Sequence, residues 1–440
     1  MLIDILIIIF VLLGVRAILY GRNGIENCFI WIIWAFCLGY RTFETIPYVA
    51  FHPIEIFSFS CIIRLFTTKH YKYRSIPSIH KLNFVIFFLI FISGFYNFNI
   101  KSFVEFKSIS LFYQFYFIAQ YIKFDDLSFF KITRSYLIPA IYISIFGILE
   151  YSNPNITSTI FQIDVQKFND PTAVLDFRLF DRLAFLFWGS HLAANIIPPI
   201  FSILIYLRYK KYGILNNNIF FLIIIFLFLI AIYLSGNRIS WLIVTIIVLN
   251  IIFFYKSFIF PNVKKYSIAI VGIFIILVYS LPATQRYFSI FNAIILNIDP
   301  TLDASSSKRL ELIISGLEIV KENFFGVGWG KILWIHNDII QITAASGIIP
   351  GIIFIYSLIY LLLRVVRYYN FINNKLPNNS KHLILFICLN FVLHTFISLV
   401  FNGNYQLIQC GAPIFLLWVI ADSYIDNSIK SKNTNINIIT

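Results

Sequence analysis

The chain has 440 residues, of which 59% are hydrophobic and only 12% are charged. A soluble protein has about 25% charged residues, so the composition excludes a soluble enzyme or a soluble binding module. The formal net charge of +14 is explained by basic cytoplasmic loops that meet anionic lipid headgroups. No basic tract with interleaved aromatic residues indicates a nucleic-acid partner. We therefore predict an integral membrane protein.

Apolar runs of about 20 residues with few charges recur along the chain, as a hydrocarbon core about 30 Å thick requires. They predict an all-α polytopic membrane protein with about 12–14 transmembrane helices, built as a single integral membrane domain over residues 1–440. The first run lacks a basic start and a small-residue cleavage site, so we expect a retained span. The predicted spans cover residues 2–20, 25–40, 47–66, 82–97, 103–122, 135–150, 183–207, 217–234, 239–255, 265–282, 338–363, 383–401 and 407–424.

The orientation of these spans follows from the basic loops, which all fall on one side in this count. By the positive-inside rule that side is the cytoplasm. The four loops cover residues 67–81, 208–216, 256–265 and 364–382. The opposite side receives two long segments, residues 151–182 and 283–337, which we predict to be periplasmic loops. Loops this long are unusual and often functional.

The larger periplasmic loop carries helical patterning of its own. Apolar residues recur at helix-face spacing from Leu310 to Val320, with serines before them and Gly326 after them. This pattern predicts an amphipathic helix on the outer membrane face. The following GVGWGK, residues 326–331, has no preceding strand and no GK[ST] ending, so it indicates a tight turn instead of a phosphate loop.

Arginines and one His-Asn pair gather on the predicted outer side. Arg238 lies in a short turn between two spans, Arg309 opens the amphipathic helix, and Arg182 stands where the other long loop enters a span. His336 and Asn337 precede a long apolar run. Unpaired cations near hydrocarbon are costly, and a guanidinium forms two parallel hydrogen bonds with phosphate. The cluster predicts a lipid that bears phosphate or diphosphate.

Each of these residues also has a structural alternative. Arg238 could reach lipid headgroups, Arg309 could pair with Glu311, and His336 could cap the following helix. The arginine of the other loop could pair with a neighbouring aspartate. Asp338 competes with the histidine as a base, although its place in the first turn of a helix favours a dipole role.

The run 309–351 resembles the motif region of the O-antigen ligase and O-antigen polymerase superfamily of bacterial surface-polysaccharide enzymes. The resemblance rests on an opening arginine, a glycine-rich turn, a His-Asn pair and two later glycines. These are Arg309, Phe325 to Gly330, His336-Asn337, and Gly347 with Pro350-Gly351. Two further segments also resemble the family. Ser235–Arg238 resembles its short turn between two spans, and Arg182–Ala194 resembles its arginine-led entry to a span. Two departures stand out: Ala345 replaces a common glutamate, and the two glycines are one residue further apart.

The resemblance implies a GT-C-like membrane glycosyltransferase that uses undecaprenyl-diphosphate-linked oligosaccharides at the periplasmic face of the bacterial inner membrane. It implies that Arg238, Arg309 and Arg182 bind the diphosphate, and that His336, Arg309 and Asn337 are catalytic. A general base suits an imidazole with a pKa of about 6.5. No metal-ligand spacing is visible, so we expect no metal and no cofactor.

Within the superfamily, the sequence favours an O-antigen polymerase that joins lipid-linked repeat units. The alternative is an O-antigen ligase that transfers the glycan to lipid A-core. A polysaccharide flippase or transporter is less favoured, because no internal repeat is visible. The expected partners are the lipid-linked oligosaccharide, membrane lipids and a candidate chain-length regulator.

Overall fold

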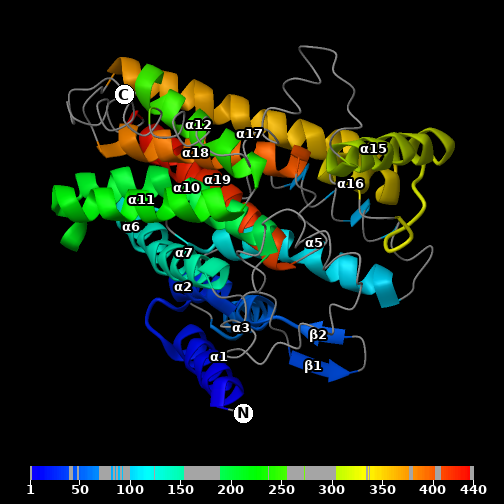
Figure 1. Cartoon of the computed structure of the whole chain (residues 1–440), viewed down its shortest axis with the longest axis horizontal. Helices are drawn as coiled ribbons and strands as arrows, with labels where there is room; N and C mark the ends of the chain where they lie inside the picture. Colours follow the sequence, from blue (N-terminus) through cyan, green and yellow to red (C-terminus); the bar gives the residue numbers. More distant parts are fainter. Residues whose placement is uncertain are drawn as a thin grey trace.

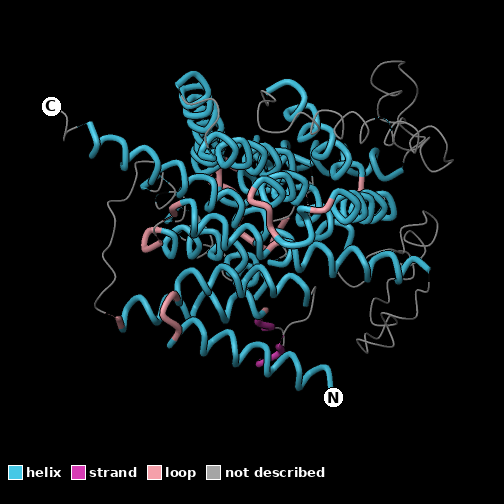
Figure 2. Tube along the Cα trace, turned by 90° about the vertical axis from the view of Figure 1, so that its left-hand side faces the viewer, coloured by secondary structure: helices cyan, strands magenta, loops and turns pink. Residues whose placement is uncertain are grey.

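The structure is a computed structural model of the chain, and its described residues are almost all helical (Figure 2). It describes residues 2–38, 43–46, 49–68, 100–122, 124–152, 189–235, 237–254, 304–332, 337–375, 380–401 and 408–436, with single positions at 81, 82, 85, 88, 89, 92, 272 and 335. The predicted span 265–282, apart from position 272, and almost all of the predicted loop 151–182 lie outside the described residues.

Three mutually packed helices begin the chain. They are α1 (Leu2–Tyr20), α2 (Gly24–Ala35), which continues as the 3-10 turn η1 (Phe36–Leu38), and α3 (Pro53–Thr67). An antiparallel hairpin of β1 (Phe43–Ile46) and β2 (Val49–Phe51) precedes α3. The predicted span 47–66 is therefore wrong at its start. His52 caps α3 through its Nδ1, which accepts from the Ile54 amide at 3.2 Å, so the helix begins only at Pro53.

The described middle part of the chain adds six helices and one 3-10 turn. They are α5 (Ile100–Ala119), α6 (Asp126–Ser135), α7 (Leu137–Ser152), α10 (Gly189–Tyr209), η3 (Gly213–Asn216), α11 (Asn218–Ser235) and α12 (Arg238–Phe254). Helix α10 is central, because it packs against α7, α11, α12 and α18. Its buried positions are mostly apolar, so it forms much of the core.

The last third of the chain contributes α15 (Ala304–Glu322), α16 (Asp338–Ser346), α17 (Ile348–Lys375), α18 (Ser380–Phe401) and α19 (Ile408–Ile436). Helices α17 and α19 both pack against α18, and α19 also packs against α5. The single predicted span 338–363 is wrong, because Gly347 separates α16 from α17 with a φ of +100°.

Several described helices can cross a bilayer by length and apolar composition. Four stretches of at least 18 residues qualify: Asp126–Leu149, Asn218–Ser235, Ile348–Asn370 and Lys381–Phe401. Shorter apolar helices cover Ile5–Tyr20, Gly24–Leu38, Ile109–Ala119, Asn195–Tyr209 and Ile239–Asn250. The all-α, multi-pass class is thus confirmed, whereas the number of spans stays a prediction.

The long helices give the bundle two opposite ends, which Figure 1 shows at its right and left. At the α16 end lie α15, α16 and the start of α17. At the α6 end, Tyr424 of α19 donates to Asp126 of α6 at 2.9 Å. Phe130 of α6 contacts Tyr212 beside η3, with ring centroids 5.8 Å apart. Two of the predicted site residues lie at the α16 end: Arg309 on α15, and Asn337, which is the N-cap of α16.

Candidate active site

Helix α15 turns one face toward the segment that precedes α16. Gly316 lies on this face so closely that an added Cβ would stand 2.4 Å from the side chain of Ile335 and 2.8 Å from that of Ile340. Arg309 comes seven residues before Gly316, which is two helical turns, so both lie on the same side of α15. Arg309 is half-buried and engaged with its surroundings. The face of α15 that carries Arg309 therefore packs toward the His-Asn segment.

A neighbouring face of α15, roughly a third of a turn around the helix from Arg309, carries exposed apolar side chains. Leu310, Ile314 and Leu317 are all about half exposed, at 52%, 48% and 52%. The predicted helix is confirmed in its position, and the exposed leucines and isoleucine match the apolar face that the sequence predicts. A helix with one open apolar face beside an apolar bundle is suited to lie on a membrane surface.

The glycine-rich segment that follows α15 is a turn that closes the end of α16. Gly326, Gly328 and Gly330 have φ angles of +79°, +91° and +77°, a region that side chains with a Cβ rarely adopt. The amides of Val327 and Gly328 donate to the carbonyls of Ala344 and Ala345 at 3.0 and 2.9 Å. These two amides are used to cap a helix, so they are not available to cradle a phosphate.

Close backbone contact fixes this turn against the break between α16 and α17. A Cβ at Gly326 would lie 2.4 Å from the carbonyl oxygen of Ala345 and 2.5 Å from the amide nitrogen of Gly347. A Cβ at Gly351 would lie 2.1 Å from the hydroxyl oxygen of Thr343. The two glycines that the sequence places after the His-Asn pair thus allow α16 and α17 to meet without a gap.

The turn is also anchored to a helix from the first third of the chain. Trp329 is fully buried, and the Ser102 hydroxyl at the start of α5 donates to its backbone carbonyl. The α16 end is therefore held together by residues far apart in the sequence, and the turn is a rigid part of the bundle.

Two side chains from α16 fix the residues on both sides of His336. The Asn337 Oδ1 accepts from the Ile340 amide at 3.0 Å and caps α16. The Gln341 Oε1 accepts from the Ile335 amide at 2.6 Å, and Gln341 is fully buried. Residues 335 and 337 are consequently held at the start of α16.

The predicted site residues differ in how far the structure describes them. Arg309 and Asn337 are described, and both belong to the α16 end. Arg238 is the first residue of α12, which Asn237 caps by accepting from the Ile239 amide at 3.0 Å, but its side chain lies outside the described residues. Arg182 and His336 lie outside them entirely. Their place in the site stays a prediction.

Two neighbours of the predicted residues carry further information. Asp338 opens α16 and is fully buried, a position that favours a negative charge beside the helix amides. Gln341 was not predicted, although a glutamine within an apolar run is a signal that could have drawn attention to it. Its Nε2 has no hydrogen-bond partner among the described residues.

The comparison with protein families falls on this part of the molecule. Residues 223–356 match the family model described as O-antigen ligase. The matched segment includes Arg238, Arg309, His336 and Asn337, whereas Arg182 precedes it. No curated protein matches the chain. Residues 223–356 are thus similar to the O-antigen ligase family, which supports the resemblance to the O-antigen ligase and polymerase superfamily that the motifs carry.

Proposed function

We propose that the protein is a surface-polysaccharide polymerase of the O-antigen type. It joins undecaprenyl-diphosphate-linked repeat units at the periplasmic face of the inner membrane. The observation that supports this most directly is the packing of Gly316 against Ile335 and Ile340, because it brings the Arg309 face of α15 to the His-Asn segment inside the matched domain.

The reaction breaks the bond between the anomeric carbon of the donor glycan and an oxygen of its carrier diphosphate. A hydroxyl oxygen of the acceptor repeat unit forms the new bond, and its proton passes to His336. Negative charge grows on the leaving diphosphate, where Arg309 and Arg238 neutralise it, with Arg182 assisting. Fixed charges aimed at a developing anion lower the barrier by several kcal/mol.

Asn337 and Gln341 serve this chemistry by positioning. Their hydrogen bonds to the Ile340 and Ile335 amides hold the segment that bears His336, so that little conformational entropy is lost when the acceptor binds. The Asn337 Oδ1 is occupied by the helix cap, which leaves its Nδ2 as the group that can donate to a sugar hydroxyl.

An O-antigen ligase remains the second candidate, since the matching family model bears that description. The residue at position 345 favours the polymerase, because the chain has an alanine where the superfamily often carries a glutamate. Ala345 is only 1% exposed, and its carbonyl accepts from Gly328 at 2.9 Å. A carboxylate chain at this position would have to enter the packed turn, so this site works without that acid.

Reconstitution separates the two candidates. The purified full chain is incubated with an undecaprenyl-diphosphate-linked repeat unit, first alone and then with lipid A-core. A ladder of lengthened glycans without lipid A-core supports the polymerase. A product that forms only with lipid A-core identifies the ligase, and no transfer in either tube contradicts both.

The role of Arg309 has a matched test on the same helix. Arg309→Ala should lower the rate of polymerisation by about a hundredfold or more, and Arg309→Lys should recover part of it, since a lysine keeps the charge without the planar fork. Lys321→Ala removes the same charge from the last turn of α15 and should leave the rate within twofold. Equal losses in the alanine variants would contradict a specific diphosphate contact.

A further inference from the structure

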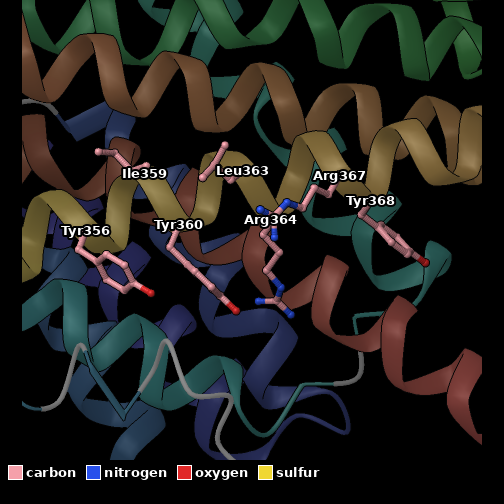
Figure 3. A pocket seen from close by; sticks show the side chains of 7 residues that line it. All are labelled: Tyr356, Ile359, Tyr360, Leu363, Arg364, Arg367 and Tyr368. Carbon is pink, nitrogen blue, oxygen red and sulfur yellow. The ribbon is translucent and has the colours of Figure 1, made fainter.

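A groove runs along the exposed face of α17 and contains none of the predicted site residues. It has a volume of about 490 Å³ and is lined by Tyr356, Ile359, Tyr360, Leu363, Arg364, Arg367 and Tyr368. These residues recur every three or four positions, so they form one stripe of the helix. Figure 3 shows Tyr356, Tyr360 and Arg364 projecting in the same direction from successive turns.

The two arginines of the α17 groove differ in their surroundings. Arg364 donates to Asp422 at 2.6 Å and also to Asp426, both on α19. Asp422 is fully buried, so the charge of Arg364 is neutralised and its guanidinium ties α17 to α19. Arg367, one turn further, is exposed and makes no ion pair within the described part of the chain. It is the available cation of the groove.

The remaining lining is apolar and faces outward. Tyr356, Ile359 and Leu363 are 55%, 44% and 47% exposed, and all three lie within the stretch Ile348–Asn370 that can cross a bilayer. From Tyr356 to Arg367 the helix rises about 16 Å at 1.5 Å per residue. This is about half of a 30 Å hydrocarbon core, so the groove has the length of one acyl chain with the cation at its headgroup end.

Contacts at the headgroup end assign the groove to one leaflet. Asp422 and Asp426 flank Tyr424 on α19, and the Tyr424 ring lies 5.1 Å from that of Phe129 on α6. Helix α6 in turn meets Tyr212, in the basic loop 208–216 that we predict to be cytoplasmic. Arg367 therefore lies at the α6 end, in the headgroup region of the cytoplasmic leaflet.

We propose that the α17 groove binds one anionic phospholipid of the cytoplasmic leaflet. Its phosphate contacts Arg367, and one acyl chain lies along Leu363, Ile359 and Tyr356. A phosphodiester carries a single negative charge, which matches the single available guanidinium. A carrier diphosphate has more charge than Arg367 can balance, because Arg364 is already bound to two carboxylates.

The test uses the full chain purified in a mild, uncharged detergent, with bound lipid counted by native mass spectrometry. The probes are phosphatidylglycerol, phosphatidylcholine with identical acyl chains, and undecaprenyl diphosphate. We expect one phosphatidylglycerol per chain, bound about tenfold more tightly than phosphatidylcholine, the effect of one charge-assisted contact. Equal binding of the two phospholipids, or displacement by equimolar undecaprenyl diphosphate, would overturn the proposal.

Variants assign the bound lipid to the α17 groove. Arg367→Gln should weaken phosphatidylglycerol binding about tenfold, and Leu363→Trp should weaken it with the charge intact because the ring fills the acyl path. Arg134→Gln removes an exposed cation from α6 at the same end and should leave binding unchanged. The assignment would be wrong if Arg134→Gln weakened binding as much as Arg367→Gln, or if Leu363→Trp folded normally and bound the lipid unchanged. It would also be wrong if delipidated chains paired through this face.

Discussion

The two ends of the bundle are held together by different means. At the α16 end, three glycines with positive φ and a set of backbone hydrogen bonds fix the turn on α16. At the α6 end, side chains join the helices. Arg364 forms ion pairs with α19, and aromatic rings of α6 contact rings of α10 and α19. Backbone contacts fix the chain to within a fraction of an ångström and leave side chains available for a substrate. The α16 end is therefore built to present residues, and the α6 end to join helices.

The largest expected effect on stability is at the α6 end. Arg364→Leu leaves the buried Asp422 beside Asp426 without their cation, and breaking a buried ion pair costs about 3–5 kcal/mol. Thermal unfolding in detergent should show a strongly lowered midpoint. Replacing Arg364 and both aspartates by leucine should recover much of the lost stability. The control variant Arg367→Leu should change the unfolding midpoint little. A stable Arg364→Leu variant would show that the carboxylates protonate or gain water at little cost.

A smaller loss of stability is expected at the α16 end, from Gly326→Ala. The new Cβ meets backbone atoms at 2.4 and 2.5 Å, and a left-handed φ of +79° adds strain, for a total of about 3 kcal/mol. Gly213→Ala is the matched control, because Gly213 has a φ of +49° but no atom within 4 Å of its Cβ. It should cost about 1 kcal/mol. Similar unfolding midpoints for both variants would mean that the contact with Ala345 and Gly347 relaxes.

The smallest expected effect separates the two roles of Asn337. Asn337→Ala removes the cap of α16 and should cost about 1 kcal/mol, whereas Asn337→Asp keeps an accepting oxygen and should unfold like the original protein. Polymerisation assays then test the proposed role of Nδ2, because the aspartate variant lacks this donor and carries a negative charge in its place. If Asn337→Asp were fully active, capping alone would explain the residue.

Much of the α16 end could be predicted from the sequence because its signals are local. The amphipathic pattern predicted α15, and the alternating glycines predicted the turn. The break at Gly347 was missed because apolar periodicity continues from Ile339 through Ile353, although Gly347 and Pro350 signal a boundary. Strand β2 was missed because its residues join the apolar run predicted as the span 47–66, and β1 was missed because strands of three or four residues give little period-2 signal.

The α6 end was less predictable because its contacts are distant in sequence. Arg364 and Asp422 are 58 residues apart, and no spacing rule links them. A sign was present in Asp422 and Asp426, which stand four residues apart on one face of an apolar helix, where carboxylates need a partner. Which cation satisfies them depends on how α17 packs beside α19, and this is tertiary information.

The bond between Ser102 and the Trp329 carbonyl has a consequence for biogenesis. Its partners are separated by 227 residues, so at about 5–20 residues per second the ribosome needs roughly 10 to 45 s between them. During this interval the first helices stand in the membrane with α5 lacking its partner turn. The α16 end is therefore completed only after most of the bundle has been inserted, and a nascent chain that stops before Trp329 lacks the turn that joins α5 to this end.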